Sequence, residues 1–165
     1  MKLFYALVTL FCLLTAAPGT AQADGFSMAS VMDAHQNIYA IKTFEDFQTK
    51  VLEASQSRRV YVYVDADWCG YCKIMTPVFV DEFLKAFGDK ANLAVIDLSN
   101  RDPQMMTLAA HLPDFGGTPH GNLYVRGKPD SQAIFMIGSV LKAPNAQAAE
   151  RILRDYISTY FHRKV

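Results

Sequence analysis

Two cysteines separated by two residues are the part of this sequence best suited to chemistry. Cys69 and Cys72 lie in the stretch "DADWCGYCKIMTPVF", which runs from residue 65 to residue 79. A pair with this spacing can bind a metal, cross-link the fold or exchange disulfides with a partner. A cross-link over so short a gap stabilises a fold very little. A zinc site needs about four ligands, and the four histidines of the chain are widely scattered. The spacing therefore favours a redox centre and no bound metal or other cofactor.

The elements around the pair place it where a strand is followed by a helix. The run "RRVYVYVDA" (residues 58–66) has consecutive β-branched and aromatic residues, as in a strand buried on both faces. The run "CKIMTPVFVDEFLKAFG" (residues 72–88) has helical periodicity and stops at a glycine. Cys69 is therefore expected at a helix N-terminus, where unpaired backbone N–H groups and the helix dipole stabilise a thiolate. We expect Cys69 to attack a partner disulfide and Cys72, one helical turn deeper, to resolve the mixed disulfide.

The rest of the chain predicts the other elements of one compact domain. A strand is expected over residues 38–41, a helix from Phe44 to about Ala54, a strand over 92–99 and a helix from Asp102 to about Leu112. After the glycine-rich break "FGGTPHG", two strands are expected around a turn at residues 126–130, and then a helix over 143–161. This order predicts an α/β fold with a mixed central β-sheet flanked by helices on both faces.

The first 23 residues read as a signal peptide. Lys2 precedes an apolar run that contains Cys12, and "AQA" (residues 21–23) offers the small residues of a cleavage site before Asp24. An apolar run of about 15 residues is shorter than the roughly 20 that span a bilayer, so an uncleaved anchor is less favoured. We expect residues 24–37 to form an N-terminal extension and residues 38–165 the domain. The chain ends "HRKV" without a retention signal, which favours a periplasmic location.

Charge and composition limit the partners. The chain has 16 basic and 16 acidic residues, so no overall field attracts nucleic acid. In the extension, Met28, Met32 and His35 recur at helical spacing. This pattern fits a soft-metal patch for copper(I), or a short amphipathic helix laid on the domain, which is the commoner explanation.

The motifs together resemble the thioredoxin superfamily. "WCGYCK", with Pro77 five residues after the second cysteine, is similar to the active-site helix of that family. Thr118-Pro119 falls where the family carries its cis-proline, ahead of a strand that enters the sheet opposite the cysteines. The resemblance extends over residues 38–160 and implies a thioredoxin-like fold.

The resemblance also implies roles for single residues. Cys69 is the attacking thiol, Cys72 the resolving thiol and Pro119 the residue that holds the substrate-binding edge. The residues expected to contact a protein partner surround the cysteines, and they are Trp68, Gly70, Tyr71, Thr118 and His120.

One position departs from the family pattern. Thioredoxins commonly bury an aspartate six residues before the first cysteine, where this chain has Tyr63. Asp65 lies two residues further along the same strand, and so on the same face. Asp65, or less favourably Asp67, is the candidate proton acceptor for Cys72, and the alternative is a solvated acid at a strand end.

Within the superfamily, "ADWCGYCK", "IDLSNRDPQMMTLAAHL" and the later Gly-Thr-Pro resemble the C-terminal periplasmic domain of the thiol:disulfide interchange protein DsbD and its small exported relatives. The disulfide isomerase DsbC also pairs Cys-Gly-Tyr-Cys with a threonine before its cis-proline, but too few residues precede Cys69 for its dimerisation domain.

The expected function is that of an exported thiol:disulfide oxidoreductase, with a reductase favoured over an oxidase or isomerase. Its partners would be protein thiols and disulfides of the periplasm and an upstream redox partner, for which a membrane electron-transfer protein is one candidate. An adaptor of a secretion or cytochrome-assembly system would be redox active as well. A redox-inert copper-binding module is the alternative from another class.

Overall fold

The computed structural model describes residues 26–130 and 144–163. Two parts of the sequence-based prediction lie outside these residues. They are the signal peptide with Cys12, and the second strand of the hairpin expected after residue 130.

The central sheet is mixed, as predicted. Its strands are β1 (Ile38–Ala40), β2 (Val60–Asp65), β3 (Asn92–Asp97), β4 (His120–Val125) and β5 (Lys128–Pro129), in the order β1-β3-β2-β4-β5. β3 pairs in parallel with both β1 and β2, whereas β4 is antiparallel to β2 and to β5. β2 is therefore the central strand, and its carboxyl end leads directly to the cysteine pair.

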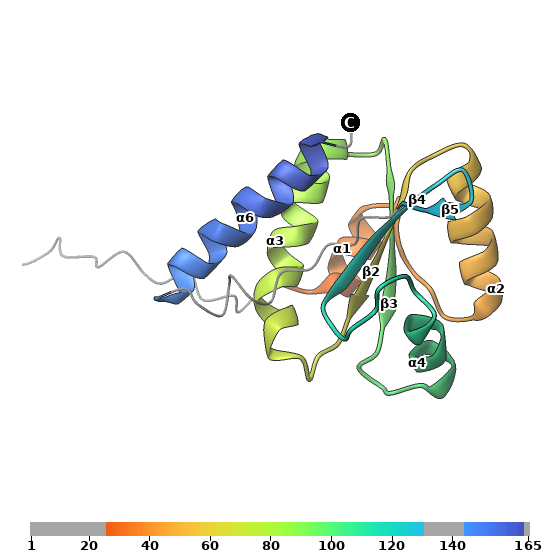
Figure 1. Ribbon diagram of the computed structural model, residues 1–165, viewed down its shortest axis with the longest axis horizontal. Coiled ribbons are helices and arrows are strands. Elements are labelled where there is room, and N and C mark those ends of the chain that lie inside the picture. The colour runs from red at the N-terminus through yellow and green to blue at the C-terminus, as the bar shows by residue number, and fades with distance from the viewer. Residues whose placement is uncertain (1–25, 131–143, 164–165) are drawn as a thin grey trace, which may run out of the picture.

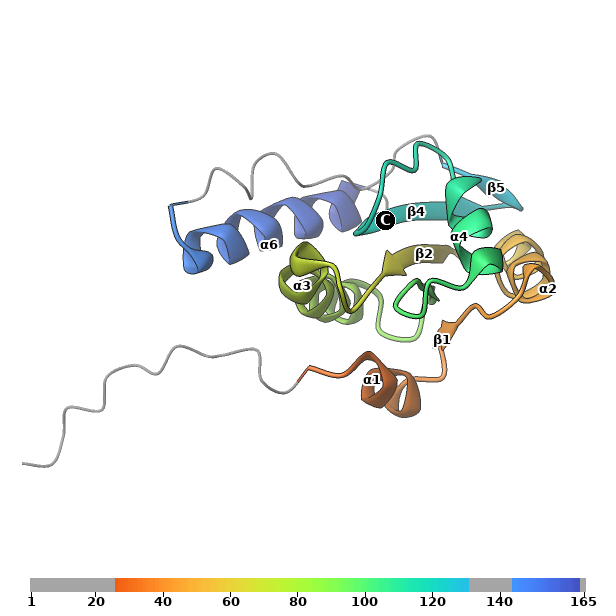
Figure 2. The same cartoon turned by 90° about the horizontal axis from the view of Figure 1, so that it is seen from below.

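Helices cover both faces of this sheet (Figure 1). The helices are α1 (Met28–Ala34), α2 (Phe44–Phe47), α3 (Gly70–Phe87), α4 (Pro103–Ala110) and α6 (Ala146–Arg163). In the view from below, α3 and α6 lie side by side on one side of the strands, and α2 and α4 lie on the other (Figure 2). Helices on both faces are the layered arrangement that the sequence predicted.

Strand β2 explains why two apolar cores form. Tyr61 and Tyr63 point toward α3 and α6, whereas Val60, Val62 and Val64 point toward α4 and the helical segment after β1. Side chains alternate along a strand, so five consecutive buried residues supply both faces at once. This is the buried central strand expected from "VYVYV".

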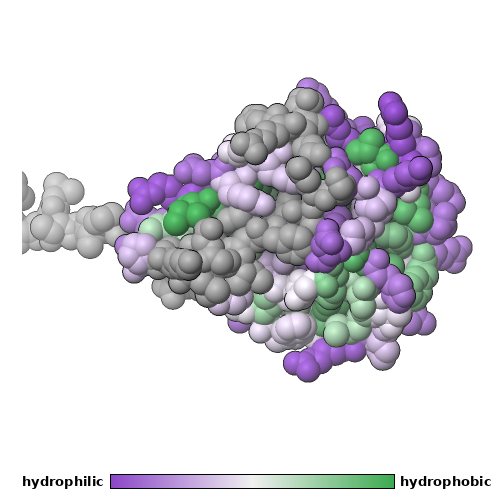
Figure 3. Space-filling model, viewed as in Figure 1, coloured by the Kyte–Doolittle hydropathy of each residue, from purple (hydrophilic) through white to green (hydrophobic). Residues whose placement is uncertain are grey.

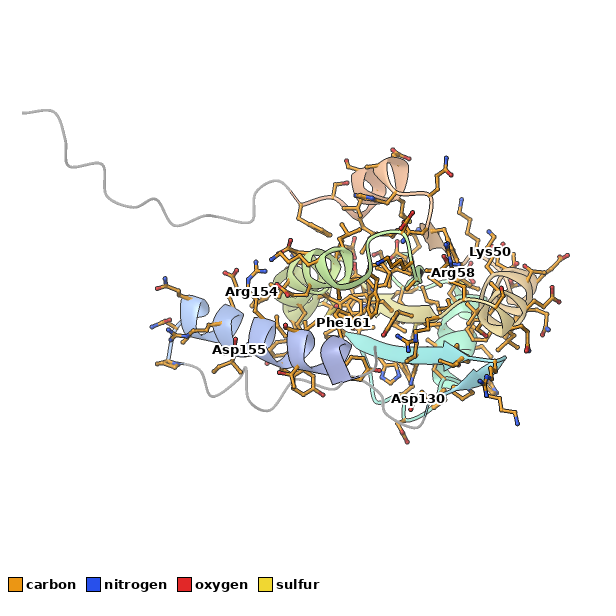
Figure 4. The ribbon with its side chains drawn as sticks, turned by 90° about the horizontal axis from the view of Figure 1, so that it is seen from above. Lys50, Arg58, Asp130, Arg154, Asp155 and Phe161 are labelled. Atoms are coloured by element: carbon orange, nitrogen blue, oxygen red, sulfur yellow. A yellow bond between two sulfur atoms is a disulfide. The ribbon has the colours of Figure 1, made fainter. Side chains whose placement is uncertain are left out.

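The C-terminal helix is held on α3 by aromatic packing and by an ion-pair cluster. Phe161 is fully buried, with its ring centroid 5.2 Å from that of Tyr61 and 5.4 Å from that of Phe79. Arg154 of α6 pairs with Asp81 and, at 2.9 Å, with Glu82 of α3. Figure 4 labels Arg154 and Phe161, and both side chains lie on the side of α6 that faces α3. These contacts join α6 and α3 into one layer.

The helix expected from residue 44 to about residue 54 is not a regular α-helix. After α2 the chain continues as a π-helix, η1 (Gln48–Glu53), and then as a 3₁₀ turn, η2 (Ala54–Gln56). The Thr49 hydroxyl donates to the Glu45 carbonyl, and the Tyr39 hydroxyl donates to the Lys50 carbonyl. Such side-chain bonds compete with the backbone ladder, which periodicity alone does not reveal.

The turn after β4 is tighter than the predicted turn at residues 126–130. Arg126 and Gly127 have φ values of 54° and 75°, which form a two-residue hairpin loop, and residues 128–129 already pair with β4. The Arg126 N–H donates to the Ser55 carbonyl, and the Gly127 N–H donates to the Ser55 hydroxyl at 3.1 Å. Because of these contacts with the η2 turn, the hairpin loop ends at residue 127, before the end of the turn that the sequence predicted.

The described surface is mixed in character. In Figure 3 hydrophilic side chains lie around much of the outline, with smaller apolar areas between them. Within residues 26–130 and 144–163, no helix combines the length and hydropathy needed to cross a membrane.

Candidate thiol–disulfide site

The two cysteines form a disulfide at the start of α3. Cys69 is the N-cap residue of the helix and Cys72 lies in its first turn, with their Cα atoms 5.2 Å apart. This separation is within the range that a disulfide spans without displacement of the backbone. The sequence prediction that Cys69 lies between a strand and a helix is confirmed.

The helix terminus makes Cys69 the better nucleophile of the pair. Its Sγ accepts a hydrogen bond from the Cys72 backbone N–H at 3.1 Å, the N-cap contact that a serine or aspartate usually provides. An anion at this position also faces the positive end of an 18-residue helix dipole. Both residues are buried, and Cys69, at 6% exposed, is slightly less so than Cys72, at 2%. The hydrogen bond and the helix dipole both favour a Cys69 thiolate.

The segment before β4 closes the other side of the sulfur. The Sγ of Cys69 lies 3.5 Å from the Thr118 carbonyl oxygen, to which the Cys69 thiol can donate a hydrogen bond in the reduced state. The Thr118–Pro119 peptide bond is cis. Gly117, before it, has a φ of 128°, which favours glycine. Residues far apart in the sequence thus meet at the end of the sheet where α3 begins (Figure 1).

Trp68, next to Cys69, is exposed, but contacts with the loop after β3 hold its side chain in place. Its side chain is 46% exposed, and its Nε1–H donates to the Leu98 carbonyl at 3.1 Å. The guanidinium of Arg101 lies over its ring, 5.2 Å from the centroid. The backbone N–H of Asp67 also donates to the Ser99 hydroxyl at 2.9 Å. The loop after β3 therefore braces the segment that precedes the cysteines.

The residues between the cysteines face solvent. Gly70 is exposed, and a side chain at that position would meet no atom within 4 Å. Tyr71 and Ile74 are 36% and 41% exposed and lie three residues apart on α3, hence on one face of the helix. We refer to Trp68, Tyr71 and Ile74 as the apolar rim. These three side chains give exposed apolar area next to the cysteine pair.

Asp65 ends β2 and contacts α3 beneath the cysteine pair. Its Oδ1 accepts a hydrogen bond from the Thr76 hydroxyl at 2.8 Å, and the same hydroxyl lies 3.2 Å from the Tyr63 hydroxyl. Burial raises the pKa of Asp65 above its usual value, and the Thr76 hydrogen bond opposes that rise. Thr76 follows Cys72 by one helical turn. Asp65 is thus a half-buried acid joined to α3, in contrast to a solvated acid at a strand end.

His120 lies in a different environment from the one expected for a partner-binding residue. It begins β4, opposite Val64, and is only 1% exposed. Its Nε2 lies 2.6 Å from the Asn122 Oδ1, and its ring meets Phe115 edge-on. Burial lowers its pKa. The structure does not support direct contact of His120 with a partner, because its neighbours enclose the ring.

The N-terminal helix is the amphipathic element that periodicity indicated. Met28, Val31 and Met32 of α1 are partly buried and pack against the core formed with α3 and α6. The two methionines thus take part in core packing, as the commoner explanation of their spacing requires. Across the described ranges, no group of three or more His, Cys, Asp or Glu side chains is placed to hold a metal ion.

Three residues of the site had not been singled out from the sequence. Thr76 bridges Asp65 and Tyr63, Arg101 covers Trp68, and Asn122 pairs with His120. Thr76 could have been identified from the sequence, because it lies four residues after Cys72 on a predicted helix and shares its face. No local pattern marks the other two, whose contacts depend on how loops far apart in the sequence fold together.

The chain combines a thioredoxin-like sheet with a disulfide-forming CxxC pair at a helix N-terminus. This combination is typical of thiol–disulfide oxidoreductases. The sequence profile of the thioredoxin family matches residues 39–130. The chain belongs to the thioredoxin family.

One solved thioredoxin shares the fold at low sequence identity, and two others match with slightly lower scores. The thioredoxin of Malassezia sympodialis matches with a TM-score of 0.50 and 18% identity, over 75% of this chain and 93% of that one. Thioredoxin O2 of Arabidopsis thaliana matches at 0.49 and 16%, over 72% and 93% of the two chains. Thioredoxin of Fasciola hepatica matches at 0.49 and 22%, over 73% and 96%. No curated protein matches the sequence closely enough to be counted as a relative.

Proposed function

We propose that this protein is an exported protein-disulfide reductase that works through Cys69 and Cys72. The observation that carries the proposal is the capping geometry, in which the Cys69 Sγ accepts the Cys72 backbone N–H at the start of an 18-residue helix. That arrangement stabilises a thiolate on the outer cysteine and keeps the second thiol within bonding distance.

The reaction proceeds through a mixed disulfide. The Cys69 thiolate attacks one sulfur of the partner disulfide, forms a new S–S bond to it and releases the other sulfur as a thiolate. Cys72 then loses its proton and attacks the Cys69 Sγ, which releases the second partner thiolate. The partner gains two electrons, and Cys69 and Cys72 lose two on closing their own disulfide. The same steps in reverse oxidise a dithiol.

The proton of Cys72 needs an acceptor, and we assign that role to Asp65. Its carboxyl is half-buried, has a raised pKa and is joined through Thr76 to the helix that carries Cys72. An acid with a raised pKa binds a proton at a pH where an exposed carboxylate would not. The assignment predicts that Asp65→Asn slows the resolving step more at low pH than at high pH, where Cys72 ionises without help. Unchanged resolution rates across pH would contradict the assignment.

Protein partners would dock over the apolar rim and the backbone at Thr118. The rim offers exposed apolar area around the disulfide. The resemblance to the thioredoxin superfamily gives Pro119 the role of holding the neighbouring backbone in place. His120 acts on this edge from inside, as a positioning residue through Asn122, whose Nδ2–H donates to the Pro113 carbonyl at 3.3 Å.

The proposed location is the periplasm, after removal of residues 1–23. The support is the sequence pattern of a short basic start, an apolar run and the "AQA" site. A reductase in an oxidising compartment needs a supply of electrons. We therefore propose an upstream donor, with a membrane electron-transfer protein as the candidate, as the resemblance to the C-terminal domain of DsbD implies.

The reduction potential of the Cys69–Cys72 couple tests the reductase assignment against oxidase or isomerase. Equilibrium titration of the full chain against glutathione, read by alkylation and mass spectrometry, gives the value. A potential near the roughly −270 mV of thioredoxin supports a reductase. A value between about −180 and −120 mV, the range of isomerases and strong oxidants, overturns the assignment in favour of a disulfide donor.

A further inference from the structure

We propose that Arg101 and Trp68 form a docking surface that selects partners with a carboxylate next to the reactive disulfide. The inference rests on the proposed function and adds to it the kind of partner segment that the site prefers. It follows from how the loop after β3 places one arginine against the aromatic side chain nearest to Cys69.

The position of Arg101 is set by its backbone and by the Trp68 ring. Its N–H donates to the Leu98 carbonyl at 2.9 Å, and the Trp68 Nε1–H donates to that same carbonyl at 3.1 Å. Arg101 has a φ of 53°, a conformation that few residues other than glycine adopt. Its guanidinium lies 5.2 Å from the Trp68 ring centroid. The cation is therefore held beside the cysteines and not on a freely rotating surface chain.

The acids nearest to Arg101 in the sequence are engaged elsewhere. Asp97 accepts the Ser99 backbone N–H at 2.8 Å and the Ser99 hydroxyl, and Asp102 accepts the Gln104 N–H at 2.7 Å as the cap of α4. Arg101 is exposed, and in the described part of the chain no ion pair joins it to Asp67 or to any other acid. Among the described residues, its charge therefore has no counter-ion.

The chemistry of a stacked arginine indicates what binds there. A guanidinium over an aromatic face keeps the N–H groups at its edge available, and these match a carboxylate with two parallel hydrogen bonds. Trp68, next to this cation, and Tyr71 and Ile74, on the helix that carries Cys72, are exposed and suit the apolar stem of a neighbouring residue. The fitting partner is an extended protein segment with a disulfide cysteine and a glutamate or aspartate close to it.

Two disulfide-linked peptide dimers test the inference. They are identical except that one has glutamate and the other glutamine beside the cysteine. The second-order rate constant for their reaction with the reduced full chain is measured by rapid quenching and chromatography. We expect the glutamate peptide to react about threefold to fivefold faster at low ionic strength, as for a well-oriented exposed charge pair, with the preference falling as salt is added.

Arg101→Gln should abolish this preference, so that both peptides react at the same rate. A far-UV circular dichroism spectrum matching that of the unaltered chain shows that the variant is folded. The matched control is Arg126→Gln, because Arg126 is likewise exposed and has a φ of 54°, but lies in the β4–β5 turn. It should keep the preference. Equal rates for both peptides with the unaltered chain, or a preference that survives Arg101→Gln, overturn the inference while the proposed function stands. Failure of both peptides to react overturns the proposed function itself.

Discussion

Replacing Thr76 by valine tests the hydroxyl chain beneath the cysteine pair. Valine has nearly the shape of threonine, so the change removes hydrogen bonds with little change in volume. Two interactions disappear, namely the 2.8 Å bond to Asp65 and the 3.2 Å contact with the Tyr63 hydroxyl. The Tyr63 side chain is 1% exposed, so water does not replace the lost partner.

The loss is expected to be about 3 kcal/mol in the free energy of unfolding at neutral pH. A hydrogen bond to a charged acceptor contributes roughly 1.5–3 kcal/mol, and a stranded buried hydroxyl costs about 1–3 kcal/mol. Burying a methyl in place of the Thr76 hydroxyl returns roughly 1 kcal/mol. Because the Thr76 bond lowers the pKa of Asp65, its removal should raise that pKa further.

Urea denaturation followed by circular dichroism gives the stability change, and NMR titration of the Asp65 carboxyl gives its pKa. Thr76→Ser is the matched control, since it keeps the hydroxyl and loses one methyl, at a cost of about 1 kcal/mol. Adding Tyr63→Phe to Thr76→Val removes the stranded hydroxyl and should recover about 1 kcal/mol. A Thr76→Val variant within 0.5 kcal/mol of the unaltered chain, by the roughly ±0.5 kcal/mol range of neutral surface changes, would refute the hydroxyl chain.

Two further predictions concern the pH dependence of stability and the C-terminal helix. The pKa of Asp65 is raised in the folded state, so the fold binds this proton more tightly than the unfolded chain and loses the associated stability as pH rises from about 4 through the folded pKa. Asp65→Asn should therefore reduce that decline and be more stable than the unaltered chain at pH 7; an unchanged pH profile in urea denaturation would contradict the assigned burial. Phe161→Ala should lower the free energy of unfolding by about 3–5 kcal/mol, because the buried ring contacts Tyr61, Phe79 and Phe83. A shift of the denaturation midpoint equivalent to less than about 1 kcal/mol would show that the packing of α6 does not depend on this ring.

The fold was predictable because its strongest signals are local. The run "VYVYV" supplies both faces of β2, Asp102-Pro103 starts α4, and Gly88 ends α3. The η1 and η2 segments were not predictable, because they follow from side-chain bonds and from contacts with the β4–β5 turn. Long-range contacts override local periodicity there.

The part of the site that the sequence predicted is the cysteine pair, whose spacing is visible in the sequence. Cys69 at a helix N-cap follows from the adjacent strand and helix, and Thr118 beside it follows only from the family resemblance. The burial of His120 could not be read locally, because the strand start, the Asn122 partner and the Phe115 ring come together only in the folded chain. The cation over Trp68 likewise depends on a loop that begins thirty residues later.

Trapping of the mixed disulfide is the most direct test of the central claim, that Cys69 attacks and Cys72 resolves. Reduced Cys72→Ser and Cys69→Ser variants of the full chain are mixed with a peptide disulfide. The reaction is quenched with acid, and the products are identified by mass spectrometry. The account predicts that Cys72→Ser accumulates a peptide adduct on Cys69, whereas Cys69→Ser forms little adduct in the same time. Equal trapping by both variants, or faster trapping on Cys72, would contradict it.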